Sequence, residues 1–288
     1  MPRQILRQVA ACVSILTGAQ LAGPAHSAPL PATIASAGHL TIGINCSYPP
    51  AGYVGLDGQP AGYEIALAKR IAEAAFPGGK GLETQCMNDS NRIPFLQSGK
   101  IDMVLAALAW TPARAEQIDF SDPIWISNLQ LVVAKGSPIK TYKDLAGKTV
   151  VTTTGSIYEA WLSKCSKAEV VTAQSPADAS NMLTQGRVDA MAYIDVYSFN
   201  FTKRNAGYRL AGDLASPAIQ GIGVRKGNTE LMAWLNGVIA DLRAKDAFFD
   251  AFKAEVSDAS FAAKYRPVVP GPDRVVKYSN PADAGCTD

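Results

Sequence analysis

Short apolar runs alternate with amphipathic stretches along most of the chain, and this alternation limits the folds that the sequence can adopt. Residues 40–44 and 149–153 have the length and the β-branched content of buried strands. Residues 63–76 place apolar side chains on one face of a helix, which Pro and Gly at 77–79 terminate. Strands that alternate with helices predict an α/β fold, with mostly parallel sheets flanked by helices.

The other predicted elements continue this order towards an extended tail. Strands are expected over residues 82–87, 101–108, 129–134, 188–194 and 222–225. Helices are expected over residues 90–98, 157–164, 177–185 and 196–204, from residue 112, and within 230–265. Residues 266–288 are rich in Pro and Gly and are predicted to be extended.

The N-terminus has the pattern of a secretory signal peptide. Arg3 and Arg7 precede an uncharged stretch over residues 9–22, and small residues lead to a predicted cleavage site after Ser27. No later segment reaches the roughly 20 apolar residues that a spanning helix needs. Residues 1–27 are therefore expected to be removed, which leaves a secreted protein in an oxidising compartment.

Charge and motifs narrow the function classes. Lys and Arg total 27 against 25 Asp and Glu, and the excess lies in the predicted signal peptide. A neutral chain without basic blocks does not favour nucleic acid as a partner. The sequence has no dinucleotide- or phosphate-binding glycine motif, no nucleophile elbow and no metalloprotease motif, and only two His. No cofactor, metal or catalytic residue is expected.

The cysteines suggest structural disulfides. Cys12 would leave with the signal peptide, and Cys46, Cys86, Cys165 and Cys286 would remain in an oxidising compartment. The sequence has no Cys-x-x-Cys spacing, which is the pattern typical of zinc or redox chemistry. The expected result is two disulfides, for which three pairings are open.

Arg114 is the leading candidate for binding an anion. Thr111 and Pro112 follow a predicted buried strand and have the pattern of a helix start, where free N–H groups attract negative charge. Arg114 in that first turn could bind a carboxylate in bidentate fashion. The alternative is a surface Arg paired with Glu116 or Asp119.

Four other strand-to-helix junctions or strand ends carry candidate side chains. Arg92 could be a second anion-binding group or a solvated Arg, and Ser156 with Ile157 could offer N–H groups or only cap a helix. Asp195 could meet an ammonium group or cap the helix that follows it. Tyr48 could be an aromatic wall or a core residue. Together these residues favour a receptor for a small zwitterion with extra negative charge.

The order and spacing of several segments resemble the family 3 periplasmic solute-binding proteins of ABC-type amino-acid importers. The likeness covers about residues 38–265. Its segments are Gly38-His39-Leu40-Thr41-Ile42-Gly43-Ile44, Tyr48-Pro49-Pro50, Gly62-Tyr63-Glu64-Ile65, Leu96-Gln97-Ser98-Gly99-Lys100-Ile101-Asp102, Thr111-Pro112-Ala113-Arg114, Ile118-Asp119-Phe120-Ser121-Asp122-Pro123, Asp144-Leu145-Ala146-Gly147-Lys148 and Gly186-Arg187-Val188-Asp189-Ala190.

The resemblance implies a two-lobed periplasmic binding protein fold of type II, with the ligand in a cleft between the lobes. Lobe one would comprise residues 38–127 and 226–265, and lobe two residues 128–225. Hinge closure would bury the ligand. The implied partners are a small carboxylate or amino acid and an inner-membrane ABC permease, and the receptor is expected to be a monomer.

The resemblance also implies a role for each candidate residue. Arg114 would bind the α-carboxylate, helped by the backbone of Thr111 and by the N–H groups of Ser156 and Ile157. Asp195 would anchor the ammonium group, and Tyr48 would pack on the ligand stem. Asn91-Arg92-Ile93-Pro94 is similar to the glutamate- and aspartate-binding members, in which that Arg meets the side-chain carboxylate. An acidic amino acid is therefore the expected ligand.

Three positions depart from the family pattern. Ala109 stands where a hydroxyl residue is common, and Ile157 where many members have Thr. The usual ammonium-binding Asp position is occupied by Ile194, and Asp195 comes one residue later. Because a slip of one residue in a strand reverses the side chain's face, Asp195 would need a bulge to reach the ligand. Otherwise the ammonium group is bound differently, or the ligand has none.

Two other functions and one disulfide pairing complete the expectations. A dehydratase-like enzyme on the same fold would need a general acid, for which Glu64 and Asp195 are the available acids. A binding module for a non-amino-acid carboxylate, serving a sensor or a periplasmic enzyme, is the other alternative. Cys46 and Cys86 follow strands that should be neighbours in lobe one, so they are expected to pair. Cys165 and Cys286 would then tie the tail to lobe two.

Overall fold

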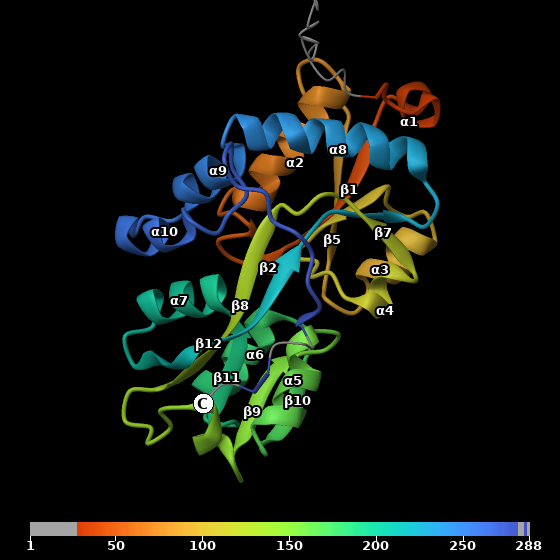
Figure 1. The fold of residues 1–288 in the computed structure, drawn as a ribbon. Helices are drawn as coiled ribbons and strands as arrows, with labels where there is room; N and C mark the ends of the chain where they lie inside the picture. Colours follow the sequence, from red (N-terminus) through yellow and green to blue (C-terminus); the bar gives the residue numbers. More distant parts are fainter. Residues whose placement is uncertain (1–27, 282–284, 287–288) are drawn as a thin grey trace, which may run out of the picture.

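The computed structural model describes residues 28–281 and 285–286, and the predicted signal peptide lies outside these residues. They form two α/β lobes, one above the other in Figure 1. Within this described part, no helix combines the length and the apolar character that crossing a membrane requires.

The first lobe, at the top of Figure 1, is built on a five-stranded sheet of order β5-β1-β6-β13-β7. Its strands are β1 (Leu40–Asn45), β5 (Leu82–Met87), β6 (Met103–Leu105), β7 (Ile118–Phe120) and β13 (Gly223–Arg225). Its helices are α1 (Ala32–Ala37), α2 (Tyr63–Ala75), α3 (Arg92–Gln97), α4 (Pro112–Ala115), α8 (Thr229–Ala244), α9 (Ala247–Glu255) and α10 (Ala259–Tyr265). A small sheet of β2 (Ser47–Tyr48), β3 (Gly52–Val54) and β4 (Pro60–Ala61) adjoins it.

The second lobe has a five-stranded sheet of order β10-β9-β11-β8-β12. Its strands are β8 (Trp125–Ala134), β9 (Thr149–Thr153), β10 (Glu169–Ala173), β11 (Ala190–Ile194) and β12 (Tyr208–Gln220). Its helices are α5 (Ile157–Cys165), α6 (Pro176–Thr184) and α7 (Asp195–Arg204), with a 3-10 turn at Tyr142–Leu145. Side chains cap the first turns of α5 and α6. Ser156 accepts from the N–H of Tyr158, and Ser175 accepts from the N–H of Asp178 and precedes Pro176 at the first position of α6.

Both sheets are mixed, but most of their strands share one direction, which agrees with the mostly parallel sheets predicted from the sequence pattern. In each sheet three neighbouring strands are parallel: β5, β1 and β6 in one, and β10, β9 and β11 in the other. Only one strand in each sheet runs against the others: β13 is antiparallel to β6 and β7, and β8 is antiparallel to β11 and β12, so the other four strands share one direction.

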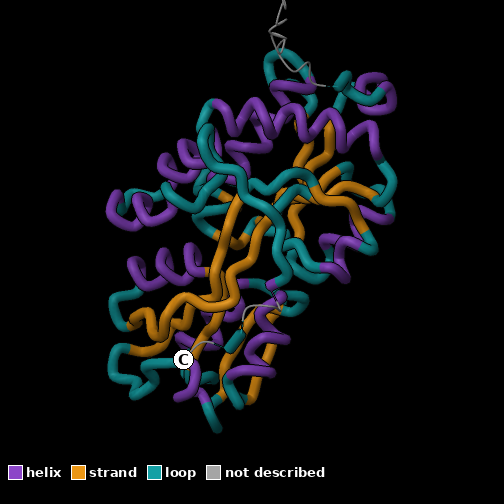
Figure 2. Tube along the Cα trace, viewed as in Figure 1, coloured by secondary structure: helices purple, strands orange, loops and turns teal. Residues whose placement is uncertain are grey.

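The return to the first lobe comes earlier than the predicted boundary at residue 225. β13 pairs with β6 through Gly223 and Val224 and with β7 through Gly223 to Arg225, so residues 223–225 belong to the first sheet. The last residue of β12 is Gln220, which pairs with Trp125 at the start of β8. Both lobes meet at this pair of long strands, which pass between them in Figure 2.

An aromatic cluster supports the two crossing strands. The Trp125 ring lies 5.0 Å from Tyr63, 4.7 Å from Phe252 and 5.5 Å from Tyr265, measured between ring centroids. Trp125 is buried, so the start of β8 is fixed to the α2, α9 and α10 side of the first lobe.

The C-terminal tail leaves α10 and runs over the first lobe towards the second. Arg274 forms an ion pair with Asp246, and the hydroxyl of Tyr278 donates to the carbonyl of Ser121 over 2.6 Å. The Tyr278 ring stacks on Trp110 at 5.6 Å. A side chain at Gly221 would collide with the Tyr278 hydroxyl, so this approach requires glycine there.

Two disulfides join the four remaining cysteines in the expected pairs. Cys46–Cys86 links the ends of the neighbouring strands β1 and β5. Cys165–Cys286 links the last residue of α5 in the second lobe to the tail. The tail is therefore a covalent connection from the first lobe to the second.

Candidate functional site

A small cavity lies between the lobes, at the carboxyl ends of the parallel strands. Its volume is about 20 Å³, which is room for roughly one water molecule. The first lobe contributes Asp89, Arg92, Ala107, Ala109 and Arg114, and the second contributes Ser156, Ile157, Tyr158, Tyr193 and Ile194, with Ser127 and Gln220 from the crossing strands. Hydrogen bonds from Arg114 to Gly155 and from Thr153 and Tyr193 to Asp89 join the two lobes across this cavity.

Arg114 reaches across the cleft from α4. Thr111 begins this helix by accepting from the N–H of Arg114, with Pro112 at the first position. The guanidinium donates to the carbonyl of Ala109 over 2.8 Å and to the carbonyl of Gly155, in the second lobe, over 2.9 Å. Burial lowers the pKa of Arg114 to about 9, with a smaller effect of Arg92 in the same direction, while Asp89 opposes both. A carboxylate bound here would relieve the desolvated charge.

The start of α5 faces Arg114 from the second lobe. Ile157 is the first residue of this helix, so its N–H has no acceptor within the helix. The N–H of Ser156 instead donates to the carbonyl of Thr153 over 3.1 Å, and its hydroxyl oxygen caps the N–H of Tyr158. Of the two N–H groups expected to bind a carboxylate, only that of Ile157 is left for this role. Thr111 lies outside the cavity lining.

Arg92 lies in the cavity wall, but its guanidinium already has partners within the first lobe. Its Nη1 donates to the carbonyls of Ala106 and Ala107 over 2.8 and 3.1 Å and lies 3.3 Å from Oδ1 of Asp89. Its Nε donates to the carbonyl of Asp89 over 3.2 Å. Arg92 is only 3% exposed. Arg92 was expected to face either the solvent or the ligand. It is instead a buried member of an ion pair with Asp89.

Asp89 is the site residue that the sequence analysis missed. It precedes α3 and is the carboxylate in the cavity lining. Its Oδ2 accepts from the hydroxyl of Thr153 over 2.6 Å and from that of Tyr193 over 3.0 Å, both in the second lobe. One carboxylate thus joins the lobes and neutralises Arg92. Its position three residues before Arg92 in the sequence is the signal that could have indicated the pair.

Asp195 does not reach the cavity, and this corrects its expected role as the ammonium anchor. β11 pairs with β8 in a continuous register from Ala190 to Ile194, so no bulge turns the next side chain inward. Ile194 lines the cavity, while Asp195 accepts from Asn128 and from the N–H of Val196. Burial raises the pKa of Asp195, and hydrogen bonds from Asn128 and Tyr265 oppose the shift. Asp195 is therefore a buried, hydrogen-bonded residue outside the cavity.

Tyr48 is fully buried and packs across the lobe boundary. Its ring centroid lies 5.7 Å from those of Tyr193 and Tyr197, with an edge-on arrangement towards Tyr193. Tyr193 lines the cavity, whereas Tyr48 lies behind it. In this closed arrangement Tyr48 supports the wall, and contact with a ligand stem would require the lobes to move.

Glu64, one of the acids considered for catalysis, is buried beneath the first-lobe side of the cleft. Its Oε1 accepts from the N–H of Ala107 over 2.7 Å, and the residue is 1% exposed. Burial raises the pKa of Glu64 to about 8, although the hydrogen bond from Ala107 and the charge of Arg92 oppose it. The carboxyl group lies outside the cavity lining, which gives it a structural role.

This raised pKa predicts a pH dependence of folding stability. The pKa of Glu64 is about 8 in the folded protein and has an ordinary value of 4.5. The contribution of the protonated Glu64 to folding stability is therefore fully present below about pH 4.5 and is lost as the pH rises through about 8. The slope should be about 1.4 kcal/mol per pH unit at most. Glu64→Gln should flatten it in urea unfolding at pH 5 and 8. Glu73→Gln, at an exposed position of α2, is the matched control; equal slopes for all three proteins would contradict the assignment.

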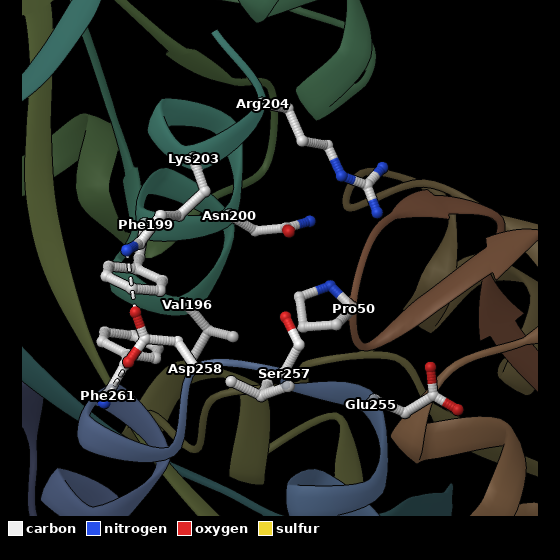
Figure 3. Close-up of a pocket in the computed structure, with 11 residues that line it drawn as sticks. Pro50, Val196, Phe199, Asn200, Lys203, Arg204, Glu255, Ser257, Asp258 and Phe261 are labelled. Atoms are coloured by element: carbon white, nitrogen blue, oxygen red, sulfur yellow. Dashed lines mark hydrogen bonds and ion pairs between the residues drawn. The ribbon is translucent and has the colours of Figure 1, made fainter. Parts of the chain in front are cut away.

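A second contact between the lobes lies outside this cleft. Lys203 of α7 forms an ion pair with Asp258 at 2.8 Å, and the rings of Phe199 and Phe261 stack with centroids 3.5 Å apart. Figure 3 shows these pairs at the edge of a pocket of about 420 Å³, into which Asn200 and Arg204 point. This open pocket lacks a cation placed like Arg114, which spans the cleft between the two lobes. Among the described residues, no cluster of His, Cys, Asp or Glu could hold a metal ion.

Comparison with known proteins identifies the class. Residues 40–253 match the bacterial extracellular solute-binding proteins of family 3. The chain is 30% identical over 218 residues to the L-cystine-binding protein TcyJ of Escherichia coli, which covers 74% of this chain and 80% of the relative. It is 28% identical over 203 residues to the ABC transporter glutamine-binding protein GlnH of Bacillus subtilis, covering 70% and 74% of the two chains.

The solved structures agree with this class. A solute receptor for L-cysteine from Neisseria gonorrhoeae superposes with a TM-score of 0.77 at 28% identity, covering 82% of this chain and 96% of that receptor. The fold is therefore the type II periplasmic binding protein fold. The chain belongs to the family 3 bacterial extracellular solute-binding proteins. The tail after residue 253, including Tyr278 and Cys286, lies outside the region that the family shares.

Proposed function

We propose that this protein is a periplasmic receptor that binds one amino acid between its lobes and delivers it to an inner-membrane ABC permease. The observation that carries the proposal is Arg114, a half-buried cation that spans the cleft and faces the start of α5. The α-carboxylate of the ligand would accept hydrogen bonds from the guanidinium of Arg114 and from the N–H of Ile157. Relatives named for cystine, glutamine and cysteine support an amino-acid ligand.

Hinge closure is the second part of the proposal. The cavity of about 20 Å³ is too small for an amino acid, so the crossing strands β8 and β12 must bend for entry. Contacts that span the cleft, such as Arg114 with Gly155 and Asp89 with Tyr193, would re-form around the ligand. The permease would then bind the closed form of the receptor. We propose that the receptor acts as a monomer, with the amino acid as its only small-molecule partner.

The acidic specificity expected from the sequence depended on Arg92. In the structure Asp89 lies 3.3 Å from that guanidinium, so a free second cation is not available. None of the relatives named above is described as binding glutamate or aspartate. We therefore propose an amino acid as the ligand, and we do not propose that its side chain is acidic.

Isothermal titration calorimetry with the twenty common amino acids, cystine and a set of simple dicarboxylates tests the proposal. We expect at least one amino acid to bind with a micromolar or tighter Kd, and its deaminated analogue to bind more weakly. Binding of dicarboxylates alone would favour the non-amino-acid module and would contradict the proposal.

A further inference from the structure

Asp89 has a consequence for ligand selection that goes beyond the proposed function. Its carboxylate carries a negative charge into a wall that otherwise presents Arg92 and Arg114. The Asp89 side chain is 5% exposed and the Arg92 side chain 3%, so water screens the pair weakly. Arg92 is thus neutralised within the wall, and Arg114 is the cation left to meet a carboxylate.

A second carboxylate on the ligand would meet an unfavourable environment at Arg92. To reach the guanidinium it would approach Asp89, and two buried carboxylates at one site repel each other. Nη1 of Arg92 is also occupied by the carbonyls of Ala106 and Ala107, which removes part of the bidentate edge that a carboxylate uses. An uncharged or cationic side chain avoids this repulsion, and its N–H or O–H can donate to Asp89.

The contacts of Asp89 with the second lobe fix its position. Thr153 and Tyr193 both donate to Oδ2, while Oδ1 faces Arg92. A carboxylate offers about four acceptor positions on its two oxygens, so Oδ1 retains capacity for a ligand donor. Because Thr153 and Tyr193 come from β9 and β11, this arrangement forms when the lobes close, and selection would occur in the closed state.

We propose that Asp89 is the specificity-determining residue of this receptor: it neutralises Arg92, excludes amino acids with a side-chain carboxylate, and admits those with an uncharged or cationic side chain. This inference rests on the proposed amino-acid receptor function. It assigns to Asp89 and Arg92 together the role that Arg92 alone was expected to have.

The test compares the wild type with Asp89→Asn and Asp89→Ser by calorimetry. The ligands are glutamate, aspartate and the tightest amino acid without a side-chain carboxylate. The wild type should bind that amino acid at least tenfold more tightly than glutamate or aspartate. Both variants remove the negative charge that neutralises Arg92, so the ratio of affinities should shift by at least tenfold towards the acidic pair. Asp89→Asn keeps the shape of the side chain, and thermal unfolding of both variants verifies that each folds.

Thr153→Val is the matched control. It removes the hydrogen bond that Thr153 donates to Oδ2 of Asp89 but keeps the charges of Asp89 and Arg92. The affinities for both ligand classes should therefore fall equally, and their ratio should stay unchanged. A wild type that prefers glutamate or aspartate overturns the inference alone, as does an unchanged ratio in both folded Asp89 variants. A wild type that binds no amino acid instead contradicts the proposed function itself.

Discussion

Arg114→Met should lower the affinity for the cognate amino acid by at least 100-fold. The substitution keeps the unbranched stem and removes the cation that would receive the ligand α-carboxylate. A charge-assisted hydrogen bond contributes about 1.5–3 kcal/mol, and a bidentate pair contains two of them. Arg114→Lys should recover only part of the loss, because a point charge cannot reproduce the two parallel bonds. Calorimetry on the three proteins measures the effect.

Arg225→Met is the control for Arg114→Met. Arg225 is an exposed residue of β13 in the same lobe, and removing it makes the same chemical change away from the cleft. Its affinity should equal that of the wild type. A folded Arg114→Met protein with wild-type affinity would show that the carboxylate is bound elsewhere, and the proposed site would be wrong.

Replacing Cys165 and Cys286 with Ser should destabilise the protein and widen its opening. This disulfide closes a loop with a sequence separation of 121 residues and connects the tail of the first lobe to α5 of the second. Removing a disulfide typically costs roughly 2–4 kcal/mol of unfolding free energy. Because this bond also limits the separation of the lobes, the ligand-free double variant should have a larger radius of gyration in small-angle X-ray scattering.

The double replacement of Cys46 and Cys86 provides the comparison. That bond lies within the first lobe, between β1 and β5, so its loss should reduce stability without changing how far the lobes separate. If both double variants show the same radius of gyration as the wild type without ligand, the tail does not limit opening.

Local patterns were sufficient to predict most elements of the fold. β5 and β9 have the predicted bounds, and α2 ends one residue before the predicted end, ahead of Pro77. These elements are determined by periodicity and by terminating residues close in sequence. The single reversed strand of each sheet, β13 in the first and β8 in the second, was not predicted, since strand direction depends on where the chain crosses between lobes.

The site was predicted in part because its contacts join distant segments. Arg114 was recognised from its helix start, a local signal. Asp89 was missed because its partners Thr153 and Tyr193 lie 64 and 104 residues further along the chain. Asp195 was assigned to the ligand although a strand without a bulge directs it to the other face.

A crystal structure with the tightest-binding amino acid tests the central claim most directly. We predict that the α-carboxylate lies within hydrogen-bond distance of both the Arg114 guanidinium and the N–H of Ile157, and that Asp89 is still paired to Arg92. A ligand whose carboxylate lies on Arg92, or one that occupies the pocket between α7 and α10, would contradict it.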